Sequence, residues 1–139
     1  MFQLVYTSVA TTAFTADLLR KLLVGARANN TGLGVSGMLL HVEGSFLQVL
    51  EGERAVVDAL YVKIGTDRRH ARVSVLVSRE VTERNFPDWS MGFVDATAKA
   101  ASTVGYRAGV GFADLAGDAD KVMKIIADFR DGRWRARAA

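Results

Sequence analysis

The sequence predicts an α+β fold, a ferredoxin-like β-α-β-β-α-β(β) mixed sheet with two helices on one face and C-terminal helices on the other. Short apolar segments typical of strands are separated by two longer segments in which apolar residues recur at intervals of three and four. After residue 95 the composition turns rich in alanine and glycine, and a helical apolar stripe returns only near the C-terminus.

The first half of the chain supplies a strand, a helix and a hairpin. Residues 2–9 (FQLVYTSV) suit a first strand, and Thr15 can begin a helix that should end within NNTGLG at 29–34. Two strands follow at 35–42 (VSGMLLHV) and 46–52 (FLQVLEG), joined by the turn VEGS. The second of them is apolar on both faces, which is typical of a strand in the middle of a sheet.

The second half of the chain is predicted to form a helix, two strands and a C-terminal helix. Helical spacing predicts a helix over 54–64, and alternation predicts a strand over 71–81. A short fifth strand is expected at 88–94 (DWSMGFV), after the single proline. An apolar stripe predicts a helix over 117–131, which we expect to cover the second face of the sheet.

Composition excludes several classes of site. The chain has no cysteine, which rules out disulfides, thiolate nucleophiles and cysteine-based metal sites, and with only His41 and His70 we expect no metal centre. No apolar run approaches the roughly 18–20 residues of a membrane span, and the N-terminus lacks a charged signal segment. We therefore expect a cytoplasmic protein. The net charge of +3 resides in the tail 130–139, so the folded body is balanced.

Enzyme motifs are missing from the sequence. The glycines of GYRAGVG (105–111) match neither the dinucleotide nor the phosphate-loop pattern. Glu51 and Glu53 stand at the end of a strand, where a solvated turn is a better interpretation than an acid–base pair. We expect no catalytic residues and no enzyme.

A sparse polar set remains inside the apolar frame. It comprises Tyr6 on the first strand, Asn30 near the end of the first helix, Gln48 on the third strand and the segment 67–70 (DRRH) after the second helix. Each has a simple structural explanation when taken alone. Together, the strands and helix ends of this topology can bring them to one slot between the two helices.

The same residues lie in blocks that resemble the BLUF domain, a flavin-binding blue-light sensor. The blocks follow that family's order and cover residues 2–94: LVYTS at 4–8, NNTGLGVSGMLL at 29–40, FLQVLEGE at 46–53, DRRH at 67–70 and RNFPDWSMGF at 84–93. The resemblance implies a photosensor domain over 1–94, with 95–139 as a helical cap and basic tail of the same globular unit. It also implies FAD held non-covalently between the helices, with FMN or riboflavin as possible substitutes.

The resemblance assigns roles to four residues of a light switch. It implies that Gln48 faces flavin N5 and O4 on one side and the hydroxyl of Tyr6 on the other. Tyr6 would give an electron and then a proton to the excited flavin, and the amide would be left rotated or tautomerised, with red-shifted absorption. Trp89 and Met91 match the fifth-strand residues proposed to exchange places near the glutamine and carry the signal out.

The resemblance also implies the residues that bind the cofactor. Asn30 would pair with the C4=O and N3–H edge of the ring, and Ala26 departs from a serine found in several members. The full implied set is Asn30, Gln48, Lys63, Ile64, Asp67, Arg69 and His70.

Three functions stay open at this stage. The leading one is a stand-alone photoreceptor whose output is altered binding to an unknown downstream signalling protein or to itself, as a homo-oligomer. The alternative is a flavin- or small-ligand-binding module that does not respond to light. An RNA-binding domain is the third, but nucleic acid is disfavoured because GSFLQVL lacks spaced stacking aromatics.

Overall fold

A five-stranded sheet with the order β4-β1-β3-β2-β5 organises the computed structural model of the chain. The structure describes residues 1–11, 15–87, 91–97, 106–107 and 111–131. β5 runs parallel to β2 and the other neighbours are antiparallel, so the sheet is mixed, as predicted. The strands are β1 (Phe2–Ala10), β2 (Ser36–Val42), β3 (Ser45–Gly52), β4 (His70–Glu80) and β5 (Gly92–Asp95).

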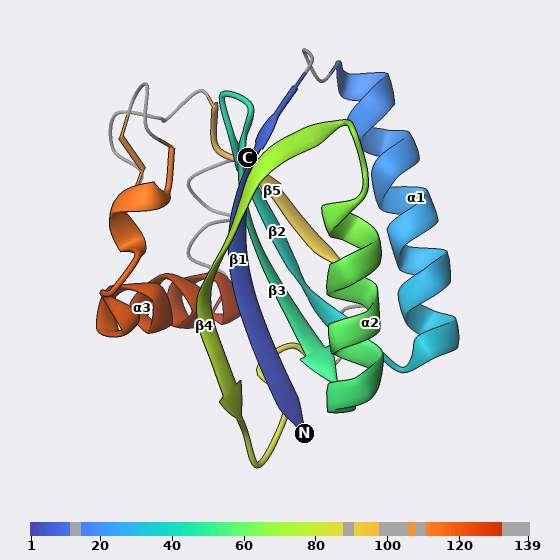
Figure 1. Cartoon of the computed structure of the whole chain (residues 1–139), viewed down its shortest axis with the longest axis vertical. Helices are drawn as coiled ribbons and strands as arrows, with labels where there is room; N and C mark the ends of the chain where they lie inside the picture. The colour runs from blue at the N-terminus through green and yellow to red at the C-terminus, as the bar shows by residue number, and fades with distance from the viewer. Residues whose placement is uncertain (12–14, 88–90, 98–105, 108–110, 132–139) are drawn as a thin grey trace.

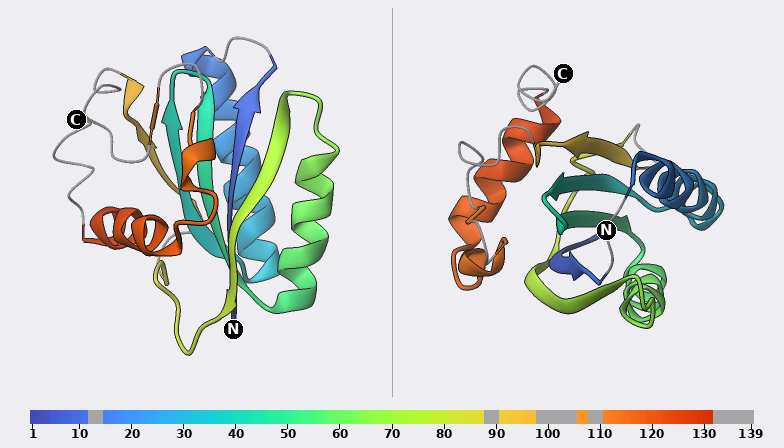
Figure 2. Two further views of the ribbon diagram at one scale, coloured as in Figure 1. Left: turned by 60° about the vertical axis from the view of Figure 1, so that its left-hand side comes forward. Right: turned by 90° about the horizontal axis from the view of Figure 1, so that it is seen from above.

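Helices cover both faces of this sheet (Figures 1 and 2). Helices α1 (Ala16–Leu33) and α2 (Arg54–Gly65) lie side by side on one face. On the opposite face lie α3 (Ala119–Arg130) and the short 3-10 helix η2 (Ala113–Leu115). The predicted fold class is therefore confirmed, including the C-terminal cover.

The central strand β3 divides its side chains between two cores, as a period of two requires. Phe46, Gln48 and Leu50 face the side of α1 and α2, whereas Leu47 and Val49 pack in the core that α3 closes. Buried α3 side chains complete that second core: Val122, Ile125 and Ile126. The prediction of a central strand buried on both sides is confirmed.

Local chemistry explains where the elements begin and end. Glu43 and Gly44 take φ values of 48° and 82° and form the two-residue turn between β2 and β3, as right-twisted hairpins favour. Thr15 caps α1 by accepting a hydrogen bond from Leu18 N at 3.2 Å. The helix ends at Leu33, and Gly34, at φ 69°, is its C-cap, so Asn30 lies within the last turn of the helix.

The prediction of a solvated turn was wrong for Glu51. Its side chain is fully buried on the α3 side of the sheet. It accepts hydrogen bonds from Gln3 Nε2 at 2.9 Å, Asn85 N at 3.0 Å and Phe86 N at 2.8 Å. The segment after β4 folds back against the end of β3 and supplies the Asn85 and Phe86 donors, while Gln3 donates from β1. These donors take the place of water. Only Glu53 is exposed, at the start of α2.

Some predictions fall outside the described residues. These are the first residues of the expected fifth strand, including Trp89, and the basic tail from residue 132. Within the described part, α3 agrees with the expected C-terminal helix to within two residues at either end. None of the described helices is long and apolar enough to cross a membrane.

Candidate functional site

A cavity of about 360 Å³ opens between the helix pair and the sheet. Its volume lies within the range of small-molecule sites. Every predicted site residue that the structure describes lines it, whereas Trp89 lies outside the described residues. The structure thus brings together Tyr6, Asn30, Gln48, Lys63, Ile64, Asp67, Arg69, His70 and Met91.

At the floor of the cavity, three residues form a hydrogen-bonded row across the sheet. Tyr6 and Gln48 are direct cross-strand partners on β1 and β3. The Tyr6 hydroxyl donates to Gln48 Oε1, and Gln48 Nε2 donates to Met91 Sδ at 3.6 Å. The amide on an otherwise apolar strand therefore has a strong donor on one side and a weak sulfur acceptor on the other.

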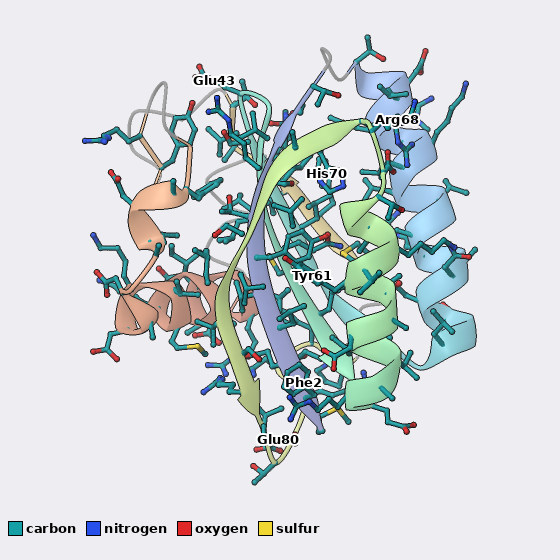
Figure 3. The ribbon with its side chains drawn as sticks, viewed as in Figure 1. Phe2, Glu43, Tyr61, Arg68, His70 and Glu80 are labelled. Atoms are coloured by element: carbon teal, nitrogen blue, oxygen red, sulfur yellow. The ribbon has the colours of Figure 1, made fainter. Side chains whose placement is uncertain are left out.

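The environment of Tyr6 keeps its phenol neutral. The side chain is only 2% exposed, and the ring meets the edge of Tyr61 with centroids 5.4 Å apart. Burial, and secondarily the Tyr61 phenol, raise the pKa of Tyr6 well above its usual range. Figure 3 shows Tyr61 projecting from α2 toward the sheet. Tyr6 therefore remains a hydrogen-bond donor at any physiological pH.

Charged residues gather where α2 runs into β4. Arg69 Nη2 bonds to Asp67 Oδ2 at 2.5 Å, and this hydrogen bonding lowers the pKa of Asp67 to about 2. His70 Nε2 lies 2.6 Å from the Ile64 carbonyl, and because a carbonyl only accepts, this nitrogen carries the proton. Lys63 also lines the cavity here. This side of the cavity thus carries cationic groups.

The cavity includes residues that the sequence analysis did not single out. On α1, Lys21, Gly25 and Asn29 follow one another at intervals of four and lie along one helix face. That spacing was visible in the sequence, but it gave no reason to prefer this face to another. The α1 lining set is Lys21, Leu22, Leu23, Gly25, Ala26, Asn29 and Asn30.

The lining suits a flat, aromatic ring system with polar edges. Apolar side chains such as Leu22, Leu60 and Ile64 come from both helices, and the amides of Asn29, Asn30 and Gln48 provide donors and acceptors. These are the groups that an isoalloxazine ring requires for its faces and its edge. No cluster of three metal-ligating side chains occurs among the described residues.

Comparisons with known proteins agree with this geometry. Residues 1–92 match the family model BLUF, described as sensors of blue-light using FAD. Relatives include the photoactivated adenylate cyclase subunit beta of Euglena longa, 35% identical over 94 residues and 65% of this chain. Another is subunit alpha of Euglena gracilis, 36% identical over 91 residues and 64% of this chain. The matches span 11% and 9% of those proteins, so this chain corresponds to a small part of each.

Solved structures resemble almost the whole chain. The structure described as "BlsA ground state" has a TM-score of 0.79 at 27% identity, covering 93% of this chain and 87% of that one. The structure described as "BlrB - a BLUF protein, dark state structure" has a TM-score of 0.73 at 28% identity, covering 92% and 96%.

Proposed function

This chain belongs to the BLUF family, the sensors of blue light using FAD, and we propose that Tyr6, Gln48 and Met91 form its light switch. One observation carries the proposal. The Tyr6 hydroxyl donates to the Gln48 amide at the floor of a cavity whose lining suits the flavin ring.

We assign the binding of FAD to residues around this switch. Asn30 and Gln48 offer amide groups to the polar edge of the ring, and Ile64 offers an apolar surface to its face. The cationic groups of Lys63 and Arg69, together with the His70 imidazole, suit the ribityl-phosphate part of the cofactor, with Asp67 orienting Arg69 through their hydrogen bonds. The cavity volume supports burial of the ring system, with the rest of the dinucleotide leaving past these charges.

The switch follows from the groups in the row. Bound flavin supplies absorption of blue light and an excited state that oxidises a nearby phenol. Tyr6 holds its proton against Gln48 Oε1, so the proton can move along a hydrogen bond that already exists. The two ends of the Gln48 amide differ only in donor and acceptor role, and its Nε2 is held by a weak sulfur acceptor. The amide can therefore rotate or tautomerise while Tyr6 and the backbone stay in place.

Substitutions of the row test the assignment. Tyr6→Phe and Gln48→Leu should each retain bound flavin and lose the reversible red shift under blue light, because most of the cavity lining is untouched. Tyr106→Phe is the control, since that hydroxyl bonds to Glu43 away from the cavity. A normal red shift in Tyr6→Phe or Gln48→Leu would reject the switch. Loss of yellow colour in a folded variant would assign that residue to binding instead.

The output of the sensor also belongs to this proposal. The curated relatives are photoactivated adenylate cyclase subunits, in which the matched part is a small fraction of a longer protein. We propose that this domain signals in the cytoplasm through altered contacts with a downstream protein or with a second copy of the chain. A light-dependent change in self-association or in capture of a candidate effector would support this output.

A further inference from the structure

An arginine outside the cavity reaches the switch from helix α1. Arg27 Nε donates to the backbone carbonyl of Met91 at 3.0 Å. Met91 is 3% exposed, and its sulfur accepts from Gln48 Nε2. Met91 thus connects helix α1, through its bond from Arg27, to the Gln48 amide on the central strand β3. Arg27 itself does not line the cavity.

The position of this contact matters because β5 is weakly held. The strand has four residues and, within the described part of the chain, pairs only with β2, in a parallel ladder. A parallel ladder is slightly less stable per residue than an antiparallel one. Its far end is fixed twice, by Ala96 N bonded to the His41 carbonyl at 2.9 Å and by His41 Nδ1 at 3.1 Å from Asp95 Oδ1. At its other end, Arg27 Nε donates to the Met91 carbonyl, one residue before β5 begins.

We propose that Arg27 is a positioning residue that keeps the Met91 sulfur on the Gln48 amide in the dark. The inference rests on the proposed switch. It adds that Arg27 holds the switch in its dark arrangement, with the Met91 sulfur on the Gln48 amide. Hydrogen bonds from charged donors are stronger than neutral ones, and the carbonyl belongs to the same residue as the sulfur. Holding the backbone of Met91 restricts the positions that its side chain can reach. Arg27 thereby favours the dark arrangement and speeds the return to it.

The test compares three variants with wild type as purified flavoproteins. Arg27→Gln removes the charge and shortens the donor, whereas Arg27→Lys keeps a charged donor and should restore part of the effect. Arg20→Gln is the control, because Arg20 lies on the same helix and bonds only to the neighbouring Asp17 among the described residues.

The main readout is the methyl resonance of Met91 in protein labelled with [13Cε]methionine and kept in the dark. Arg27→Gln should shift or broaden it, while the other three methionines, Met1, Met38 and Met123, serve as internal references. Amides of Gly92–Asp95 should exchange with solvent about fivefold faster, the effect of losing about one net hydrogen bond. After blue light, recovery of the dark absorption should slow by about the same factor, with Arg27→Lys between Arg27→Gln and wild type.

The outcomes separate this inference from the proposed function. A Met91 resonance and β5 exchange rates equal to wild type in Arg27→Gln would overturn the positioning role, even in a protein that photoswitches normally. Recovery that is unchanged or faster would overturn its part in the switch. A wild-type protein that shows no red shift would refute the proposed function instead. The dark resonance would still report whether Arg27 holds Met91.

Discussion

Replacing Glu51 by glutamine changes the donors and acceptors under the sheet with little change of shape. Oε2 accepts from Gln3 Nε2, Asn85 N and Asn85 Nδ2, and Oε1 accepts from Phe86 N at 2.8 Å. An amide must place an NH2 at one of these positions, and the least costly choice is Oε1, where one donor then faces another. The buried N–H of Phe86 loses its acceptor, and the remaining bonds lose their charge.

The magnitude follows from these losses. A hydrogen bond to a charged group contributes about 1.5–3 kcal/mol, and a buried donor without an acceptor costs about 1–3 kcal/mol. The glutamine no longer carries a buried charge, which offsets part of the loss. We therefore expect Glu51→Gln to lower the free energy of unfolding by about 2 kcal/mol. For a chain of this length, that corresponds to a melting temperature lower by roughly 6–10 °C.

Urea unfolding followed by circular dichroism measures the effect, with Glu53→Gln as the matched control. Glu53 is exposed and makes no side-chain bond to the helix it precedes, so its substitution should change stability by less than about 0.5 kcal/mol. Equal midpoints for Glu51→Gln and Glu53→Gln would refute the reasoning. Flavin binding should persist in both, because the Glu51 side chain lies on the opposite face from the cavity.

Three further predictions concern the cavity and the sheet. Above pH 10, stability should fall as pH rises. Because burial raises the pKa of Tyr6, the unfolded chain loses a proton that the folded chain keeps. Tyr6→Phe should therefore flatten the pH dependence of the urea midpoints. Gly37→Ala should prevent stable folding, since its Cβ would lie 1.9 Å from the backbone oxygen of Val49; a native circular dichroism spectrum and melting temperature would contradict this. Asn30→Ala should lower flavin occupancy, and full occupancy in an absorption titration would argue against a binding role.

Much of the fold was predictable because its signals are local. The central strand is apolar on both faces, and the glycine of VEGS suits the positive φ that the hairpin turn requires. The helices follow from spacing and from Thr15 as a cap. The pairing of Tyr6 with Gln48 is a long-range contact, and it was inferred through the family resemblance and not from the residues alone.

Other features could not be predicted, because their partners are remote in sequence. Glu51 is followed by glycine and charged residues, which resembles an exposed strand end, and its donors come from residues up to 48 positions away. Arg27 looks like an ordinary exposed arginine of a helix until β5 places the Met91 carbonyl beside it. The edge strand β4 has irregular pairing with β1 and a positive φ of 54° at Arg72, which simple alternation does not indicate.

Gln48 and Glu51, two polar residues of β3, lie on opposite faces of the sheet, and their partners differ in a way that suits the proposed switch. Glu51 has four donors, two of them backbone amides of the segment after β4, so it fixes that segment to the end of the strand. Gln48 has one strong donor, the Tyr6 hydroxyl, and one weak acceptor, the Met91 sulfur, so its amide can exchange its donor and acceptor ends at a small cost in free energy. Because the register of β3 is held by pairing on both sides, a rearranged amide has little means of moving its own strand. In the proposed switch, we expect the change to pass most directly to Met91, whose sulfur contacts the amide and whose backbone leads into β5.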